Sequence, residues 1–295
     1  MARADRKLAD NAPGPYWVDS SCIDCDLCRQ IAPGVFGHDA ARAQSIAVRQ
    51  PEGHRERRRA AMAVVACPTS SIGSEDAAEV RAAARDFPEP LDPAGRVSFC
   101  GYASQGSYGA ASYLLRRAEG NVLVDSPRAA KPLLARVRDL GGVSTMFLTH
   151  ADDVADHATF ARAFGCKRVM HQDDVRAGTR GVEQQIAGVD PVRLAGDLLV
   201  VPVPGHTRGS AALLASEEVL FSGDHLWWSE TSQRLHASRG VCWWSWAEQT
   251  RSMERLLDLR FEWLLPGHGR RWRAPSAQAM RIELEHLVRR MRAAA

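Results

Sequence analysis

Three cysteines near the start of the chain follow a compact C-x2-C-x2-C spacing. They are Cys22, Cys25 and Cys28, and a fourth cysteine, Cys67, is followed directly by a proline. Thiolates at this spacing wrap a short loop around one face of an iron–sulfur cluster, and a distant Cys-Pro supplies the remaining thiolate. The residues therefore predict one 4Fe–4S cluster held by these four thiols.

The alternative for four cysteines is a structural zinc site. Zinc sites of this kind usually consist of two separated C-x2-C pairs, and a triplet followed by a lone Cys-Pro does not have that form. A second cluster is not expected, because Ala32 occupies the place of the fourth cysteine in the two-cluster bacterial motif. Residues 14–75 resemble a single-cluster bacterial ferredoxin, which implies that the cluster carries single electrons.

A second set of candidate ligands lies in the later two thirds of the chain. Each member comes at or just after the end of an apolar run, and glycines beside two of the histidines allow sharp backbone turns. The set consists of Asp125, His150, Asp152, Asp153, Asp156, His157, His206, Asp224 and His268. Side chains at the ends of neighbouring strands can converge, so the set predicts a metal site at the edge of a sheet.

In their order along the chain these motifs resemble the metallo-β-lactamase superfamily over residues 96–295. The resemblance implies an α/β fold, the αββα sandwich, preceded here by a small α+β ferredoxin-like domain. The implied ligands are His150, Asp152 and His206 for one metal, Asp156, His157 and His268 for a second metal, and Asp224 as the bridge between them. Asp224 and Asp156 are the residues that the resemblance places in catalysis, and Asp125 would orient the loop of His150.

The first motif departs from the family pattern H-x-H-x-D-H. His150 matches the first histidine, but Asp152 stands in place of the second, and the next two ligand positions are apolar. Two readings remain open. Either the loop absorbs two extra residues and Asp156 with His157 take the usual roles, or Asp153 replaces the aspartate and shares a helical face with His157 at i, i+4.

A paired-metal site supports two kinds of chemistry. Two metals lower the pKa of a bound water and polarise a carbonyl or phosphoryl oxygen, which is hydrolytic chemistry. Asp152 adds an oxygen ligand, and carboxylate-rich sites suit iron or manganese better than zinc. We expect one or two divalent ions, iron or zinc, with manganese as a third candidate. A carboxylate at this place also occurs in the flavodiiron branch of the superfamily, whose chemistry is redox chemistry at two irons.

The fused cluster favours the redox reading, because a hydrolase has no use for single electrons. The leading hypothesis is a metalloenzyme in which the ferredoxin-like domain feeds electrons to non-haem metal. The alternative is a hydrolase of an ester, thioester or similar substrate that uses a metal-bound hydroxide, with a structural or sensory cluster. A non-catalytic electron carrier or partner-binding protein is the third candidate.

The composition limits the kinds of domain and partner that the chain can have. The 295 residues are 45% hydrophobic and 25% charged, with a net charge of +3, which predicts globular domains and no strong field for nucleic acid. We expect a ferredoxin-like domain at 1–75, a proline-rich linker at 76–95 and the metallo-β-lactamase-like domain at 96–295. The linker is expected to begin as a short alanine-rich helix at 76–87 and to continue as an extended connector. The basic segment HRERRRAAMAVVA predicts a helix with a solvated face.

The expected partners are a small-molecule substrate and, as a candidate, a redox protein. No apolar run is long enough to span a membrane, and the first residues carry no apolar export signal. Together with an oxygen-sensitive cluster, this predicts a cytoplasmic protein without a membrane or nucleic-acid partner.

The apolar pattern of the later domain predicts short strands and four helices, over 129–140, 155–164, 246–259 and 276–292. One face of the last helix carries Met280, Leu284, Leu287, Val288 and Met291. Five tryptophans either line the mouth of the metal site or pack elsewhere, namely Trp227, Trp228, Trp243, Trp244 and Trp246. The remaining cysteines, Cys100, Cys166 and Cys242, are expected to be buried thiols.

Overall fold

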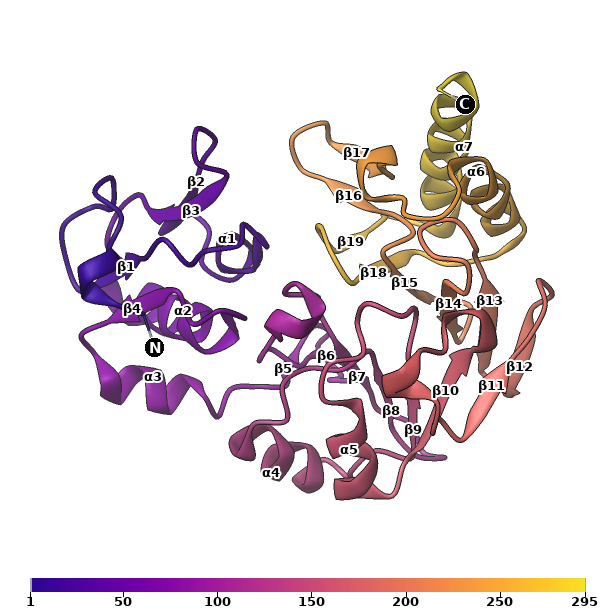
Figure 1. Ribbon diagram of the computed structural model, residues 1–295, viewed down its shortest axis with the longest axis horizontal. Helices are drawn as coiled ribbons and strands as arrows, with labels where there is room; N and C mark the ends of the chain where they lie inside the picture. Colours follow the sequence, from indigo (N-terminus) through magenta and orange to yellow (C-terminus); the bar gives the residue numbers. More distant parts are fainter. Residues whose placement is uncertain (1, 295) are drawn as a thin grey trace. The chain divides into compact units, whose positions relative to one another are not determined.

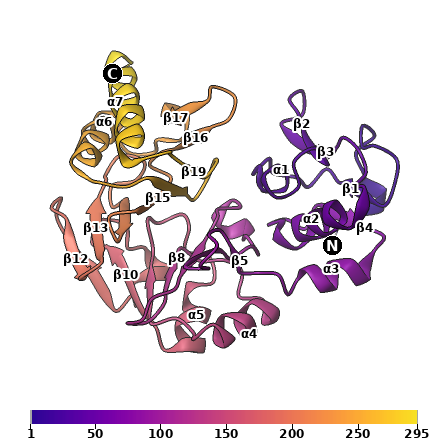
Figure 2. The same ribbon diagram turned by 180° about the vertical axis from the view of Figure 1, so that it is seen from behind.

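The computed structural model describes residues 2–294, which form two compact units. The first unit runs to Ser144 and includes Ala155–Cys166, and the second contains Thr145–Val154 and the chain from Lys167 onward. Figure 1 shows the ribbon and Figure 2 shows it from behind. No helix among the described residues combines the length and apolarity needed to cross a membrane.

The first unit begins with a small α+β arrangement around the cysteine motif. Its elements in chain order are β1 (Tyr16–Val18), α1 (Leu27–Ile31), β2 (Phe36–Asp39), β3 (Gln44–Ala47), α2 (Gly53–Ala66) and β4 (Ile72–Ser74). Strand β1 pairs antiparallel with β4, and β2 pairs antiparallel with β3. Helix α2 contains the basic segment, as predicted, and it ends directly before Cys67, so it returns the chain to the cysteine triplet.

Two of the four arginines of α2 form ion pairs within the chain. Arg58 pairs with Glu79 and Asp86, and Arg59 pairs with Glu89. These ion pairs favour the interpretation of a helix that is solvated and docked on its own chain over that of a surface for nucleic acid.

The expected linker contains the predicted short helix, and its proline-rich part, expected to be an extended connector, contributes an edge strand. Helix α3 (Ala77–Ala83) packs against α2, and β5 (Glu89–Pro90) pairs antiparallel with β6 (Val97–Phe99). Phe87 is fully buried, with its ring edge-on to Phe99. A proline is compatible with the edge of a sheet because it needs no ladder partner for its nitrogen. The division between the two compact units falls beyond this segment, and the boundary expected at residue 95 stays a prediction.

The rest of the first unit is an antiparallel meander with helices. Strands β6, β7 (Tyr113–Leu115) and β8 (Val122–Val124) pair in chain order, and all their residues are buried. Helices α4 (Lys131–Asp139) and α5 (His157–Phe164) lie within the predicted helical ranges.

The second unit contains parallel strands, a mixed sheet and two helices. Its strands are β9 (Thr145–Phe147), β10 (Lys167–His171), β11 (Gln184–Ile186), β12 (Val192–Ala195), β13 (Leu198–Pro202), β14 (Ala211–Ala215), β15 (Val219–Gly223), β16 (Trp227–Ser229), β17 (Arg234–His236), β18 (Trp263–Pro266) and β19 (Trp272–Arg273). Strands β9 and β11 flank β10 in parallel, and the second sheet has the order β12-β13-β14-β15-β18-β19. The helices are α6 (Trp246–Arg255) and α7 (Ala277–Ala293).

Short 3-10 turns complete the described elements. They are Ala4–Arg6 and Gln105–Ser107 in the first unit, and Gln172–Asp174, Ala177–Thr179, Arg239–Val241 and Leu256–Asp258 in the second.

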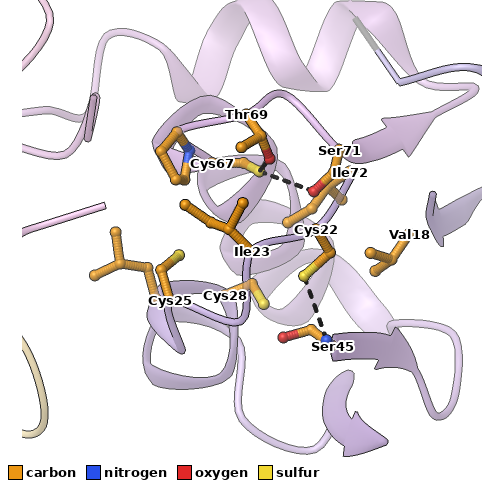
Figure 3. Close-up of a pocket in the computed structure, with 12 residues that line it drawn as sticks. Val18, Cys22, Ile23, Cys25, Cys28, Ser45, Cys67, Thr69, Ser71 and Ile72 are labelled. Carbon is orange, nitrogen blue, oxygen red and sulfur yellow. Dashed lines mark hydrogen bonds between the residues drawn. The ribbon is translucent and has the colours of Figure 1, made fainter. Parts of the chain in front are cut away.

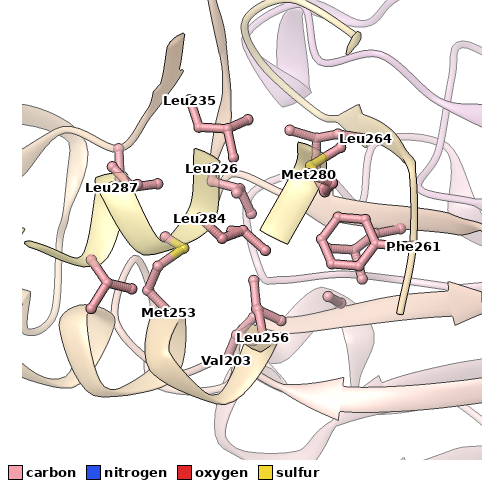
Figure 4. Close-up of a cluster of buried hydrophobic side chains, with 14 of the residues drawn as sticks. Val203, Leu226, Leu235, Met253, Leu256, Phe261, Leu264, Met280, Leu284 and Leu287 are labelled. Carbon is pink, nitrogen blue, oxygen red and sulfur yellow. The ribbon is translucent and has the colours of Figure 1, made fainter. Parts of the chain in front are cut away.

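The core beneath α6 and α7 confirms the predicted apolar face. All five residues of that face of α7 are buried. Figure 4 shows Met280, Leu284 and Leu287 together with Met253 of α6 and Phe261. Each such side chain stabilises the fold by about 1.5–3 kcal/mol when it is fully buried. This core supports the sheet whose strand ends carry the candidate metal ligands.

Candidate functional site

The four cysteines of the N-terminal motif line one pocket in the first unit. Figure 3 shows Cys22, Cys25, Cys28 and Cys67 directed into it. The other lining residues are mainly apolar. Four thiols around a mostly apolar hollow form a donor set suited to an iron–sulfur cluster.

The loop that carries the triplet is held by Arg29. Its Nη1 atom donates to Oδ1 of Asp24 at 2.6 Å and to Oγ of Ser45 at 2.7 Å, and its Nε atom donates to Asp26 at 2.5 Å. Asp24 and Asp26 both have positive φ, a conformation that aspartate tolerates better than most residues. The guanidinium therefore ties a left-handed loop to strand β3 and fixes the spacing of the thiols.

The thiols have hydrogen-bond donors and a buried setting. The backbone N–H of Ser45 donates to Sγ of Cys22 at 3.3 Å, and Oγ of Ser71 lies 3.3 Å from Sγ of Cys67. Burial raises the pKa of Cys25 to about 12 and also raises the pKa of Cys28. A nearby cation must offset this cost if the sulfurs are thiolates, and the iron ions of a cluster provide that charge.

In the second unit, parallel neighbours β15 and β18 bring Asp224 and His268 to one sheet edge. Gly223 lies opposite Pro266, and each candidate follows shortly after its strand ends. Oδ2 of Asp224 lies 2.8 Å from Nδ1 of His268, and the backbone N–H of His268 donates to Oδ1 of Asp224 at 3.1 Å. The carboxylate thus orients this histidine.

His150 and His206 present their Nε2 atoms to the same place. The two rings lie edge-on with centroids 4.8 Å apart. Nδ1 of His206 donates to the carbonyl of Val241 at 2.5 Å, and Oγ1 of Thr149 lies 2.9 Å from Nδ1 of His150. These contacts occupy the Nδ1 atoms, while both buried Nε2 atoms lack a hydrogen-bond partner among the described residues.

Two groups of ligand atoms converge around His150, each within 4.8 Å. One group is His150, Asp152 and His206, and the other is His150, Asp153 and Asp224. Nε2 of His206 lies 3.5 Å from Oδ2 of Asp152, and Nε2 of His150 lies 3.7 Å from Oδ2 of Asp224. Two ligands that are each about 2.1 Å from a tetrahedral metal lie roughly 3.4 Å apart. The donor sets therefore fit a divalent metal.

Gly267 leaves room for the second group. A β-carbon there would lie 2.7 Å from Oδ2 of Asp153 and 2.8 Å from Oδ1 of Asp224. Any side chain at this position would fill the space between the two carboxylates. This glycine, between Pro266 and His268 in the sequence, is required by close approach rather than by an unusual φ angle.

Asp156 and His157 lie in the first unit, and neither belongs to a converging group of described residues. Asp156 precedes helix α5, and its carboxylate accepts a hydrogen bond from the backbone N–H of Ala129 at 2.8 Å. His157 is the buried first residue of α5. This geometry favours Asp153 in the choice that the sequence left open. The ligand roles of Asp156, His157 and His268 and of the converging residues stay predictions, as does the orienting role of buried Asp125.

Asp174 is a residue of the site that the sequence analysis missed. It is fully buried, and it accepts hydrogen bonds from the backbone N–H groups of Ala151 at 2.9 Å and Gly209 at 2.8 Å and from the hydroxyl of Thr207. It therefore ties the loop of His150 to the loop that follows His206. Asp174 follows shortly after the apolar run of β10, as the other candidate carboxylates follow their strands. This position was the signal in the sequence that could have identified it.

The electrostatics suit metal ligands. Burial lowers the pKa of His150, which favours its neutral, metal-binding form. Burial opposes ionisation of Asp224, yet the neighbouring His268 and His150 hold the pKa of this carboxyl well below its usual range. The adjacent imidazole of His206, whose Nε2 lies 3.5 Å from Oδ2 of Asp152, lowers the pKa of Asp152. Burial opposes protonation of His206, but Asp152 and Asp224 raise the pKa of its imidazole, so the site combines a neutral His150 with ionised carboxylates.

The tryptophans divide between the two predicted positions. The ring of Trp243 lies 6.1 Å from that of His206, and the backbone N–H groups of Trp243 and Trp244 donate to the carbonyl of His206. Their side chains are 65% and 47% exposed, so they border the site without closing it. Trp228 instead stacks on Trp272 with centroids 4.2 Å apart.

The remaining cysteines confirm part of the expectation. Cys100 and Cys166 are buried, and burial raises the pKa of Cys100 to about 12. Cys242 is only partly buried, and its thiol donates to the carbonyl of Gly205 at 3.2 Å. Burial raises its pKa as well, which fits an unreactive thiol.

Two family models match the chain. Residues 18–74 match the 4Fe–4S single cluster domain of Ferredoxin I, and residues 106–268 match the metallo-β-lactamase superfamily. These matches confirm the predicted fusion and fold class.

Among curated proteins, the chain is 30% identical over 144 residues to a hydroxyacylglutathione hydrolase of Rhodospirillum rubrum, which covers 44% of this chain and 53% of that protein. It is 38% identical over 132 residues to a hydroxyacylglutathione hydrolase of Anaeromyxobacter dehalogenans, with 42% and 49% covered. The chain therefore spans about half the length of these relatives.

Solved structures of similar fold include the DIM-1 metallo-β-lactamase, at 16% identity and a TM-score of 0.49, covering 65% of this chain and 94% of that one. ETHE1 from Myxococcus xanthus matches at 19% identity and a TM-score of 0.46, covering 66% and 89%.

Proposed function

The chain belongs to the metallo-β-lactamase superfamily and carries a single-cluster ferredoxin domain, and on this premise we propose that it is a metal-dependent hydrolase of a small ester or thioester. The observation that carries the proposal is the convergence of His150, Asp152 and His206 beside Asp153 and Asp224. The similarity to two hydroxyacylglutathione hydrolases supports a thioester as the substrate class.

The chain's own residues would position the metal and the substrate. His150, Asp152 and His206 would hold one divalent ion, and the carboxylates of Asp153 and Asp224 would supply oxygen ligands for a second ion. Such ions supply Lewis acidity and lower the pKa of bound water. Asp224 would also hold His268 in place, while the exposed indoles of Trp243 and Trp244 would border the bound acyl group.

The test uses the full-length protein with its iron–sulfur cluster intact. Protein purified without air is loaded separately with zinc, iron or manganese, and hydrolysis of S-lactoylglutathione and simple acyl esters is followed. We expect turnover with at least one metal. His206→Ala should lower both bound metal and rate, whereas His286→Ala, an exposed histidine of α7 outside both groups, should leave both unchanged. Metal bound at this site without hydrolysis of any of these substrates would contradict the proposal.

Redox chemistry at the same site is the second candidate, and it was the leading hypothesis from the sequence. Asp152 favours it, because this carboxylate joins His150 and His206 in one ligand group and oxygen ligands suit iron. The ferredoxin domain favours it as well. Metal analysis of protein purified without air distinguishes the two candidate functions. Iron at the site without hydrolytic turnover supports redox chemistry. Zinc at the site with hydrolytic turnover contradicts the redox hypothesis.

A further inference from the structure

One side of the cysteine pocket lies against residues that follow the proline-rich segment, within the same compact unit. A β-carbon on Gly109 would lie 2.6 Å from the β-carbon of Cys25 and 3.1 Å from Cγ of Pro68. Gly109 also has a φ of +88°, which side-chain-bearing residues rarely adopt. The backbone at Gly109 therefore touches the ligand loop directly, and a glycine is required there.

Arg128 makes a second contact with this side of the pocket. From the loop after β8, its Nη2 atom donates to the carbonyls of Val65 at 2.9 Å and Cys67 at 3.4 Å. Its Nε atom donates to the carbonyl of Ala103 at 2.8 Å, and the guanidinium lies 5.8 Å from the ring centroid of Tyr102. Three carbonyls and one ring thus fix the guanidinium beside the backbone of one cysteine of the pocket.

The charge of Arg128 has no counter-ion among its described partners, which are carbonyls and an aromatic ring. Arg58 and Arg59 in the same unit differ, because they pair with carboxylates. A half-buried charge without a counter-ion acts more strongly on its surroundings than a paired charge. A 4Fe–4S cluster with four thiolates is negatively charged and gains one further negative charge on reduction, so a nearby cation favours the reduced form.

We propose that Arg128 is a positioning residue that raises the reduction potential of the cluster by holding a positive charge beside Cys67. The next residue of the same loop, Ala129, donates its backbone N–H to Asp156 at the start of α5. The part of the chain that follows the ferredoxin domain therefore sets the electron affinity of the cluster. This role of Arg128 depends on the cluster and not on the hydrolytic reaction. A negative result for Arg128 therefore does not contradict the proposed hydrolase function, and a negative result for hydrolysis does not contradict the role of Arg128.

The experiment is a redox titration of the full-length protein, followed by visible absorbance and by electron paramagnetic resonance of the reduced cluster. In Arg128→Gln the ratio of reduced to oxidised cluster at a fixed potential should fall about tenfold, which for a one-electron couple corresponds to about 59 mV. Arg128→Lys keeps the charge and should stay closer to the parent protein. Arg136→Gln removes an exposed arginine of α4 and should leave the potential unchanged.

A purely structural role for Arg128 would lower thermal stability in Arg128→Gln without moving the potential, and that result with an intact cluster overturns the proposal. If Arg128→Gln does not retain the cluster, Arg128→Lys decides. A potential close to that of the parent protein supports charge as the cause, whereas a tenfold change in Arg128→Lys overturns it, because the charge is still present.

Discussion

The Nε2 atom of His150 lies 3.9 Å from Oδ2 of Asp153, whereas the carboxylate of Asp156 accepts a hydrogen bond from the backbone of Ala129. We therefore expect Asp153→Asn to lower metal affinity at the His150 site by roughly tenfold or more. Asp156→Ala should retain the metal and cost about 1 kcal/mol of stability through the lost hydrogen bond. Metal titration and urea unfolding of both variants measure this, and metal loss confined to Asp156→Ala would reverse the assignment.

Gly267→Ala should impair the same site without unfolding the protein. The added β-carbon would lie within 2.8 Å of oxygens of both Asp153 and Asp224, so the two carboxylates could no longer approach one ion. We expect less bound metal and slower turnover. Gly178→Ala is the matched control, because a β-carbon there meets nothing within 4 Å. Equal metal content in Gly267→Ala and the parent protein would show that the space between the carboxylates is not a metal position.

Asp174→Asn should weaken the site from a distance. The buried carboxylate accepts hydrogen bonds from two backbone N–H groups and from Thr207, and an amide nitrogen in place of one oxygen would face a donor. We expect a loss of about 1–3 kcal/mol in stability and a 10- to 100-fold loss in metal affinity. Asp173→Asn, at the neighbouring and more exposed carboxylate, serves as the control. Unchanged metal binding in Asp174→Asn would limit its role to the fold.

Cys67→Ser should bleach the visible absorbance of the iron–sulfur cluster, because one of the four thiols that line the pocket is lost. Cys100→Ser changes a buried thiol outside the pocket and should keep the absorbance. If the protein is a hydrolase, Cys67→Ser should retain metal at the His150 site and hydrolytic turnover. Unchanged absorbance in Cys67→Ser would refute the assignment of this cysteine.

The ion pair of Glu183 and Arg168 should make stability depend on acid pH. Oε1 of Glu183 lies 2.7 Å from Nη2 of Arg168, and the guanidinium lowers the pKa of Glu183 to about 2. A lowered pKa contributes stability that is complete above the unfolded value of about 4.5 and is lost as the pH falls toward 2. Since Glu183 is partly exposed, the contribution is about 1 kcal/mol or less.

Urea unfolding of the parent protein and Glu183→Gln measures this contribution at several pH values. The difference between them should be the same at pH 7 and pH 5 and should shrink at pH 3. A difference that grows as the pH falls would have the wrong sign for this pair.

Local sequence patterns predicted much of the fold and some of the residues that converge in the candidate site. The spacing of Cys22, Cys25 and Cys28 is a property of one short loop, and the apolar face of α7 follows from helical periodicity, so neither depends on distant contacts. The order of His150, His206, Asp224 and His268 was sufficient to predict a metallo-β-lactamase fold. Short strands with continuous apolar runs, such as β14 and β15, were also recognisable.

The tertiary structure places Asp153 in a ligand group with His150, because the path of a loop after a strand depends on what holds its far end. Whether Asp153 or Asp156 binds the metal stays a prediction. Local patterns could not show the contacts of Asp174 and Arg128, although the place of Asp174 after an apolar run was a signal. Asp174 bonds to Gly209, 35 residues away, and Arg128 bonds to Val65, 63 residues away. Which chemical groups the chain has, and which local elements carry them, follows from the order of its residues alone. Long-range hydrogen bonds and packing decided which groups meet, because those contacts form only between segments that the fold brings together.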